Sequence, residues 1–243
     1  MKMNRREALR SLGALTASVT VAPYLGANEV KGFPQGTVLD EEFVPTPSHT
    51  GGLQVLNNDA HRRTLAAVFD RFIPADELGP SATQAGCIEF LDAQLAGPWG
   101  EGATMYRDTP LQPHAEELTQ LPQFIATPRE RYETGLEALN KWVSDNEDAE
   151  FADLAPERQD EILTGMEQGD IDLGQGVHTK AFFEMMLLSV REGYFSDPIY
   201  GGNRDMAGWK MIGFPGARYD YRLYADRTGE KLDLIPVSLI PQD

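Results

Sequence analysis

The chain has 243 residues and a formal net charge of −17, from 21 Lys and Arg against 38 Asp and Glu, and 41% of its residues are hydrophobic. This composition is that of a globular protein and excludes both wholesale disorder and a multi-span membrane protein. Nucleic acid and anionic lipid would repel so acidic a chain. The single cysteine, Cys87, excludes an internal disulfide, a Cys-based zinc site, an iron–sulfur cluster and a C-x-x-C-H haem attachment.

Residues 1–28 resemble a twin-arginine export signal. Arg5 and Arg6 precede a charge-free stretch, residues 11–28, that is rich in Ala, Leu, Val, Ser and Thr. Ala8 departs from the motif, which usually has Phe there. The alternatives are a basic amphipathic helix and an uncleaved anchor. Because the twin-arginine route carries folded proteins, usually with a cofactor or partner already bound, the signal predicts an exported protein that travels with a partner.

Residues 29–57 are interrupted by proline and glycine and are predicted to form an extended arm. Asn58 is then expected to cap a helix that ends before Pro74, since Leu65, Val68 and Phe69 fall at helical spacing. A second helix is predicted from the capping-box pair Ser81 and Gln84 to the stop at residues 97–98. Residues 99–124 are proline-rich and are expected to be irregular.

Three further helices are predicted. Thr127, Pro128 and Glu130 combine a cap, a proline at the first helical position and a capping-box glutamate. A shorter helix should follow Pro156 and end at Gly169, and residues 178–194, apolar on most faces, should form the most buried helix. Residues 232–240 are the one candidate strand, which its proline restricts to an edge or an extended arm.

The predicted fold class is therefore mainly α. It consists of a single helical domain over residues 58–221, an irregular N-terminal arm over residues 29–57, a long glycine-rich loop, and an extended C-terminal tail over residues 222–243.

No catalytic, cofactor-binding or metal-binding residue can be named from the sequence. The four histidines stand singly and show no H-E-x-x-H spacing, so a metal site is disfavoured. The serines lack a G-x-S-x-G elbow, and Cys87 in an apolar helix is expected to be a small buried hydrophobe. No pair of carboxylates stands in an apolar setting that would separate their pKa values.

Residues 197–216 are the most informative stretch, because they place several glycines among aromatic and basic residues. Glycine lets a backbone approach something closely, and Tyr, Trp and Arg are common anchors of interfaces. A nucleotide cradle is a weak interpretation, since neither G-x-G-x-x-G nor G-x-x-x-x-G-K-[ST] is present. A partner interface and an internally packed loop remain equally open. The candidate interface residues are Tyr200, Asn203, Arg204, Trp209 and Phe214.

Several segments resemble the gluconate 2-dehydrogenase subunit 3 family, the small or gamma subunits of membrane-bound FAD-dependent sugar or sugar-acid dehydrogenases. The resemblance covers roughly residues 58–221 and is most specific in Asp-Pro-Ile-Tyr-Gly-Gly-Asn at 197–203 and Gly-Trp-Lys-Met-Ile-Gly-Phe-Pro-Gly at 208–216. It is also carried by residues 72–83, 85–88, 95–98, Tyr132 and residues 135–136.

The resemblance implies a non-catalytic subunit without a cofactor of its own. Its partners would be a large subunit that holds FAD, a multihaem cytochrome subunit that holds haem c, and the twin-arginine translocase that exports the folded flavoprotein. The chain would then lie in the periplasm or on the outer face of the cytoplasmic membrane. The substrate is left open, because specificity in this family lies in the large subunit.

Two other functions remain as alternatives. A free-standing exported hydrolase or oxidoreductase would need a catalytic cluster assembled from dispersed Asp, Glu and His residues. A periplasmic carbohydrate-binding protein would use Trp99, Trp142 and Trp209 as stacking platforms.

Overall fold

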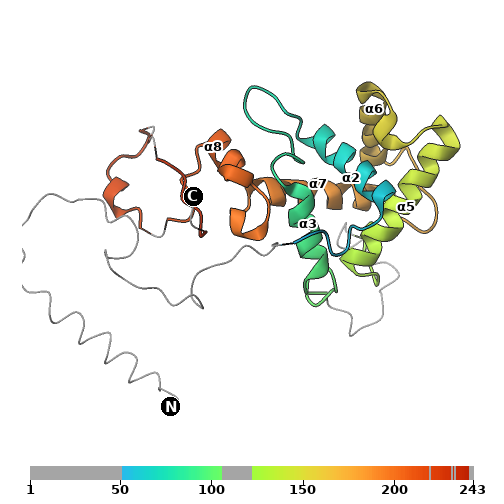
Figure 1. The fold of residues 1–243 in the computed structure, drawn as a ribbon, viewed down its shortest axis with the longest axis horizontal. Helices are drawn as coiled ribbons and strands as arrows, with labels where there is room; N and C mark the ends of the chain where they lie inside the picture. Colours follow the sequence, from blue (N-terminus) through green and yellow to red (C-terminus); the bar gives the residue numbers. More distant parts are fainter. Residues whose placement is uncertain (1–50, 106–121, 219, 231, 233, 241–243) are drawn as a thin grey trace, which may run out of the picture. The chain divides into compact units, whose positions relative to one another are not determined.

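The structure is a computed structural model that describes residues 51–105, 122–218, 220–230, 232 and 234–240. The predicted export signal, with Arg5 and Arg6, and most of the predicted N-terminal arm lie outside the described residues. The described part is mainly helical and contains no β-strand, which confirms the predicted fold class. Its six α-helices are α2 (Asp59–Phe72), α3 (Cys87–Ala96), α5 (Pro128–Glu147), α6 (Pro156–Gln168), α7 (Thr179–Phe195) and α8 (Ala207–Ile212) (Figure 1).

Most helix boundaries follow local signals in the sequence. The Asn58 side chain caps α2 by accepting a hydrogen bond from the His61 amide. At the start of α5, Thr127 and Glu130 form both hydrogen bonds of a capping box. Gly169 ends α6 in the left-handed conformation. These predicted boundaries are confirmed.

The predicted start of the second helix is wrong by several residues. Ser81 and Gln84 do form the reciprocal bonds of a capping box, with the Ser81 amide 3.0 Å from the Gln84 Oε1. These bonds close a series of turns, and α3 begins only at Cys87. The cause is Gly86, because its φ of 83° lies outside the helical region. At this residue the backbone also passes close to the carbonyl of Gly201.

The predicted strand over residues 232–240 is also not formed. The described residues of this segment make one isolated parallel bridge, between Val237 and Gly216. Pro236 has no amide hydrogen to extend the pairing. The segment is therefore an extended arm, which is the second of the two structures that Pro236 allows.

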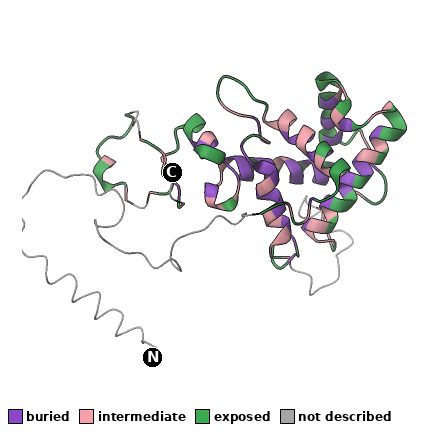
Figure 2. Ribbon diagram, in the orientation of Figure 1, coloured by how far each residue is buried: buried purple, intermediate pink, exposed green. Residues whose placement is uncertain are grey.

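Helix α7 is the centre of the helical domain. It contacts α2, α3, α5, α6 and α8, and its buried residues, shown in purple in Figure 2, lie on most of its length. Helix α7 has the largest number of buried residues, ten of 17, although α3 is buried over a similar fraction, six of ten. The pattern arises because apolar residues occupy most faces of this helix, so it has neighbours on several sides.

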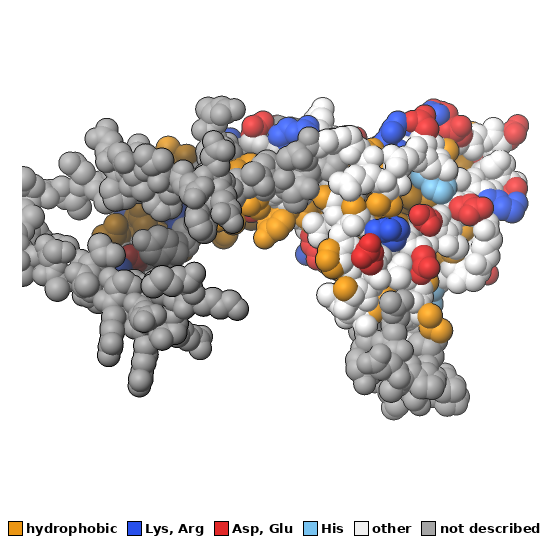
Figure 3. Space-filling model, turned by 60° about the horizontal axis from the view of Figure 1, so that its bottom comes forward, with side chains coloured by type: hydrophobic (Ala, Val, Ile, Leu, Met, Phe, Trp, Pro, Cys, Tyr) orange, Lys and Arg blue, Asp and Glu red, His pale blue; other side chains and the backbone are white. Residues whose placement is uncertain are grey.

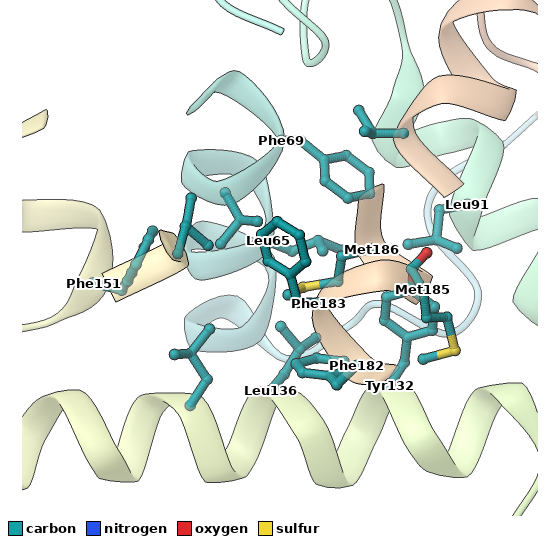
Figure 4. Close-up of a cluster of buried hydrophobic side chains, with 14 of the residues drawn as sticks. Leu65, Phe69, Leu91, Tyr132, Leu136, Phe151, Phe182, Phe183, Met185 and Met186 are labelled. Atoms are coloured by element: carbon teal, nitrogen blue, oxygen red, sulfur yellow. The ribbon is translucent and has the colours of Figure 1, made fainter. Parts of the chain in front are cut away.

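The core is built from aromatic, leucine and methionine side chains that converge on α7 from α2, α3 and α5 (Figure 4). Tyr132 is fully buried and its hydroxyl donates a hydrogen bond to Ser189 at 2.8 Å. Burial raises the pKa of this hydroxyl far above its ordinary value. Gly135 lets α5 approach the Phe182 ring so closely that a Cβ would lie 2.5 Å from it.

Ion pairs tie the outer faces of the helices together, and Figure 3 shows acidic and basic side chains next to one another over one such face. Arg71 of α2 binds Asp160 of α6 through two hydrogen bonds of 2.7 and 2.6 Å. The guanidinium lowers the pKa of the Asp160 carboxyl. Because these pairs are largely solvent-exposed, each contributes on the order of 0–1 kcal/mol to stability.

The end of the predicted N-terminal arm packs against the domain. Leu56 is buried, and Leu53 and Val55 lie against the same core. The fully buried carboxylate of Asp92, on α3, accepts hydrogen bonds from the amides of Gln54, Val55 and Leu56 at 2.7, 2.8 and 2.8 Å. One side chain thus fixes residues 54–56 to α3.

Candidate functional site

Residues 197–216 follow α7 in the chain and contain three short helical elements. The glycine content instead predicts a single long loop here. These elements are the 3₁₀-helices η3 (Pro198–Tyr200) and η4 (Arg204–Met206), followed by α8. Asp197 begins η3 by accepting a hydrogen bond from the Ile199 amide. The stretch is therefore a folded unit, built turn by turn.

The glycines of this stretch allow close approach to α7. A Cβ at position 202 would lie 2.1 Å from the carbonyl oxygen of Gly193, and one at position 208 would lie 2.1 Å from that of Tyr194. No side chain fits at such distances, so both positions require glycine. The close contact that the glycine content predicts is made with a helix of the same chain.

Asn203 fixes the fold of the stretch from within. It is fully buried and has a φ of 47°, a left-handed conformation that asparagine tolerates better than most residues. Its amide nitrogen donates to the carbonyl of Ser196 at 2.7 Å, and its side-chain oxygen accepts from the Gly208 amide at 2.8 Å. Both polar ends of this side chain are thus used inside the domain.

Trp209 is also an internal residue. Only 4% of it is exposed, and its indole N–H donates to the carbonyl of Phe195 at 2.7 Å. Its ring meets the Phe214 ring edge-on, with 5.2 Å between the ring centroids. Trp209 therefore holds α8 and Phe214 against the end of α7.

Arg204 joins this stretch to the start of α3. Its backbone amide donates to the carbonyl of Ala85 at 3.0 Å, and its guanidinium donates to the carbonyl of Gln84 at 3.2 Å. The nearest carboxylate oxygen, on Glu89, is 3.7 Å away. Since 54% of the Arg204 side chain is exposed, its charge is available to a partner.

The outward surface of the stretch is apolar. Tyr200, Ile212 and Phe214 are 46%, 56% and 42% exposed. They stand on a backbone that Asn203 and Trp209 fix from below. Of the five candidate interface residues, the structure therefore places Tyr200, Arg204 and Phe214 at the surface and the other two beneath it.

A groove that the sequence did not indicate lies beside Tyr200. Its volume is about 540 Å³, and Trp99, Phe90 and Phe195 contribute aromatic surface to it. Glu192 lines the same groove, and partial burial raises the pKa of its carboxyl. The groove joins residues that are about a hundred positions apart in the chain, so no local pattern could have revealed it.

Elsewhere in the described part of the chain, the side chains that could ligate a metal are dispersed. Among the described residues, no group of three or more His, Cys, Asp or Glu side chains is arranged to hold a metal ion. The Cys87 thiol is buried, and this burial raises its pKa to about 12, so it is held in the unreactive thiol form.

The three tryptophans do not form an exposed platform. Trp209 is buried, while Trp99 and Trp142 are partly buried against the core. Only Trp99 lines the groove described above. This arrangement disfavours a carbohydrate-binding surface built from all three rings.

Fold and site together define a helical domain with an internally braced, glycine-rich surface stretch. The model of the family Gluconate 2-dehydrogenase subunit 3 matches residues 59–216, and the chain belongs to this family. No curated protein and no solved structure matches the chain significantly. Within the part of the chain that the structure covers, none of the helices has the length and apolar character needed to cross a bilayer.

Proposed function

We propose that the chain is the non-catalytic small subunit of an FAD-dependent gluconate or sugar dehydrogenase, and that it binds the FAD-containing large subunit through the outer face of residues 197–216. Family membership supports a role as a subunit of such a complex. The observation that carries the interface is the exposure of Tyr200, Arg204 and Phe214 on a rigid, internally hydrogen-bonded support. Such pre-organised aromatic and arginine anchors are typical of interface hot spots.

In this proposal Asn203 and Trp209 position the anchors and do not touch the partner. The twin-arginine motif, Arg5 and Arg6, directs the assembled pair to the twin-arginine translocase. The complex then works in the periplasm or on the outer face of the cytoplasmic membrane, where a cytochrome subunit with haem c accepts its electrons. The large subunit determines the substrate.

The interface is tested with Arg204→Ala in the full chain co-expressed with the large subunit. The matched control is Arg62→Ala, which removes another partly exposed arginine with a carboxylate partner. Loss of a hot spot weakens assembly by about 2 kcal/mol or more, whereas loss of a largely exposed ion pair costs the subunit about 0–1 kcal/mol. We therefore expect less co-purified flavin for Arg204→Ala alone. Wild-type yield of Arg204→Ala through a salt series would defeat the interface assignment.

The same preparation separates the proposal from its alternatives. We expect the lone chain to be colourless and inactive, and the co-purified pair to be yellow and to reduce an acceptor dye. Activity of the lone chain would instead indicate a free-standing enzyme. Affinity of the lone chain for sugars, measured by calorimetry, would indicate a carbohydrate-binding protein.

A further inference from the structure

Exposed apolar side chains are concentrated in the last part of the chain. Of the twelve large hydrophobic residues that are exposed among the described residues, nine lie from residue 200 onward. Five of these follow the family match, which ends at residue 216. They belong to residues 217–240, termed here the C-terminal segment, and are Tyr221, Leu223, Ile235, Val237 and Leu239.

As far as its residues are described (217–218, 220–230, 232 and 234–240), the C-terminal segment is a loop whose two ends are fastened together. The Ala217 amide donates to the carbonyl of Val237 at 2.7 Å, beside the bridge between Val237 and Gly216. A Cβ at Gly216 would lie 2.2 Å from that same carbonyl oxygen, so only glycine permits this closure. Arg218 adds a hydrogen bond of 2.8 Å to the carbonyl of Ile235.

Asp197 fixes the closed end of this loop to the start of the candidate interface. Its carboxylate accepts hydrogen bonds from the Ser238 hydroxyl at 2.8 Å and from the Leu239 amide at 2.9 Å. Asp197 also caps η3, which carries Tyr200. The loop is thereby held next to residues 197–216, yet Leu223 and Ile235 remain 79% exposed. Compact surface loops of about 6–16 residues are packed by their own side chains, whereas this longer loop leaves Leu223 and Ile235 in water.

The distribution of charge identifies the kind of partner that would cover these groups. Residues 51–200 carry ten Lys and Arg against 27 Asp and Glu, whereas the C-terminal segment carries four of each. Two of its basic residues are already paired, Arg222 with Asp220 and Arg227 with Glu230. A segment with no net charge, in which two of the four basic residues are already paired, is not suited to an anionic membrane, which attracts basic clusters. A second copy of the chain would bring another strongly acidic body close to the first.

We propose that the C-terminal segment is a second docking element for the large flavoprotein subunit, whose matching face is apolar and close to neutral. This inference rests on the proposed function, because it takes the same partner for the adjoining surface. The segment extends the interface of residues 197–216 by the fixed loop, with Leu223 and Ile235 as its anchors. A segment that carries both apolar anchors and charge pairs matches the composition of protein interfaces, with a hydrophobic centre and a polar rim.

The test uses the full chain co-expressed with the large subunit, with Leu223→Asp and Ile235→Asp as the variants. The controls are Leu78→Asp and Ile125→Asp, which change side chains of similar exposure, 66% and 67%, outside the segment. We expect each variant to lower the flavin that co-purifies at least tenfold, and each control to stay within twofold of wild type. Because all four side chains are exposed, the melting temperature of each lone chain should be unchanged.

Hydrogen exchange of the wild-type pair gives an independent measurement, in which amides of residues 220–239 should become protected on assembly. Wild-type co-purification of both variants, without protection, would overturn the docking element and leave the proposed function intact. Failure of the wild-type chain itself to bind the flavoprotein would overturn both. Light scattering that shows a dimer of the lone chain, lost in Leu223→Asp, would replace the flavoprotein by a second copy. Vesicle binding that is lost in the same variant would replace it by a membrane.

Discussion

Replacing Asp92 by Asn should destabilise the helical domain by about 3 kcal/mol, a large part of the total for a typical domain. The carboxylate is fully buried and accepts three backbone amides from residues 54–56. Hydrogen bonds to a charged group contribute about 1.5–3 kcal/mol each. Asn keeps one side-chain oxygen, which can still accept from the amides of Val55 and Leu56, but these two bonds lose the carboxylate charge. Its NH2 group would face the Gln54 amide, which is also a donor, so that bond is lost in full.

Urea unfolding followed by circular dichroism measures this loss, and hydrogen exchange locates it. The amides of residues 54–56 should exchange faster in Asp92→Asn than in wild type, while those in the middle of α7 should stay protected at low denaturant. The matched control is Asp145→Asn, which breaks an exposed pair with Lys141 and should cost about 0–1 kcal/mol. An Asp92→Asn protein within about 0.5 kcal/mol of wild type, below the lower figure for one charged hydrogen bond, would refute this account of the carboxylate.

Three further changes test other parts of the molecule. Trp209→Ala should lower the free energy of unfolding by about 3–5 kcal/mol, the usual cost of removing a buried Trp; an unchanged thermal melt would show that the indole is not a structural anchor. Asp160→Asn should weaken the domain above the ordinary carboxyl pKa of 3.8, and the difference from wild type should vanish as the pH falls through the lowered pKa of the folded state; a pH series of urea unfolding measures it, and a difference that persists in acid would contradict the ion-pair explanation. Changing Arg5 and Arg6 together to Lys should leave this chain and the flavoprotein in the cytoplasm on fractionation, and normal external dehydrogenase activity would contradict the shared export signal.

Features of the fold that depend on neighbouring residues could be predicted from the sequence. The capping box of Thr127 and Glu130 joins residues three apart, so these two residue types alone are sufficient to place the start of α5. Ser81 and Gln84 form the same local bonds, but the position of α3 also depends on the contact between Gly86 and Gly201. That contact spans more than a hundred residues, and no local pattern contains it.

The candidate site divides in the same way. Sequence composition indicated residues 197–216 but could not decide between an interface and internal packing. The structure shows which of these side chains are internal and which are exposed, since Trp209 faces α7 while Phe214 is 42% exposed. The long-range bonds of Asp92 and Asp197 cannot be predicted from the sequence, because they join each carboxylate to backbone amides 36 to 42 residues away. Any residue type can supply a backbone amide, so such partners leave no signature in the sequence.

The contacts beneath residues 197–216 also determine when this surface can exist. The Arg204 amide needs the carbonyl of Ala85, Gly202 needs the end of α7 beside it, and Asp197 needs Ser238. None of these groups is in place until α3 and α7 have packed together and the C-terminal segment has closed. A nascent or misfolded chain would therefore lack the shape of the proposed interface. In the proposed complex, binding at this surface would admit only fully folded copies.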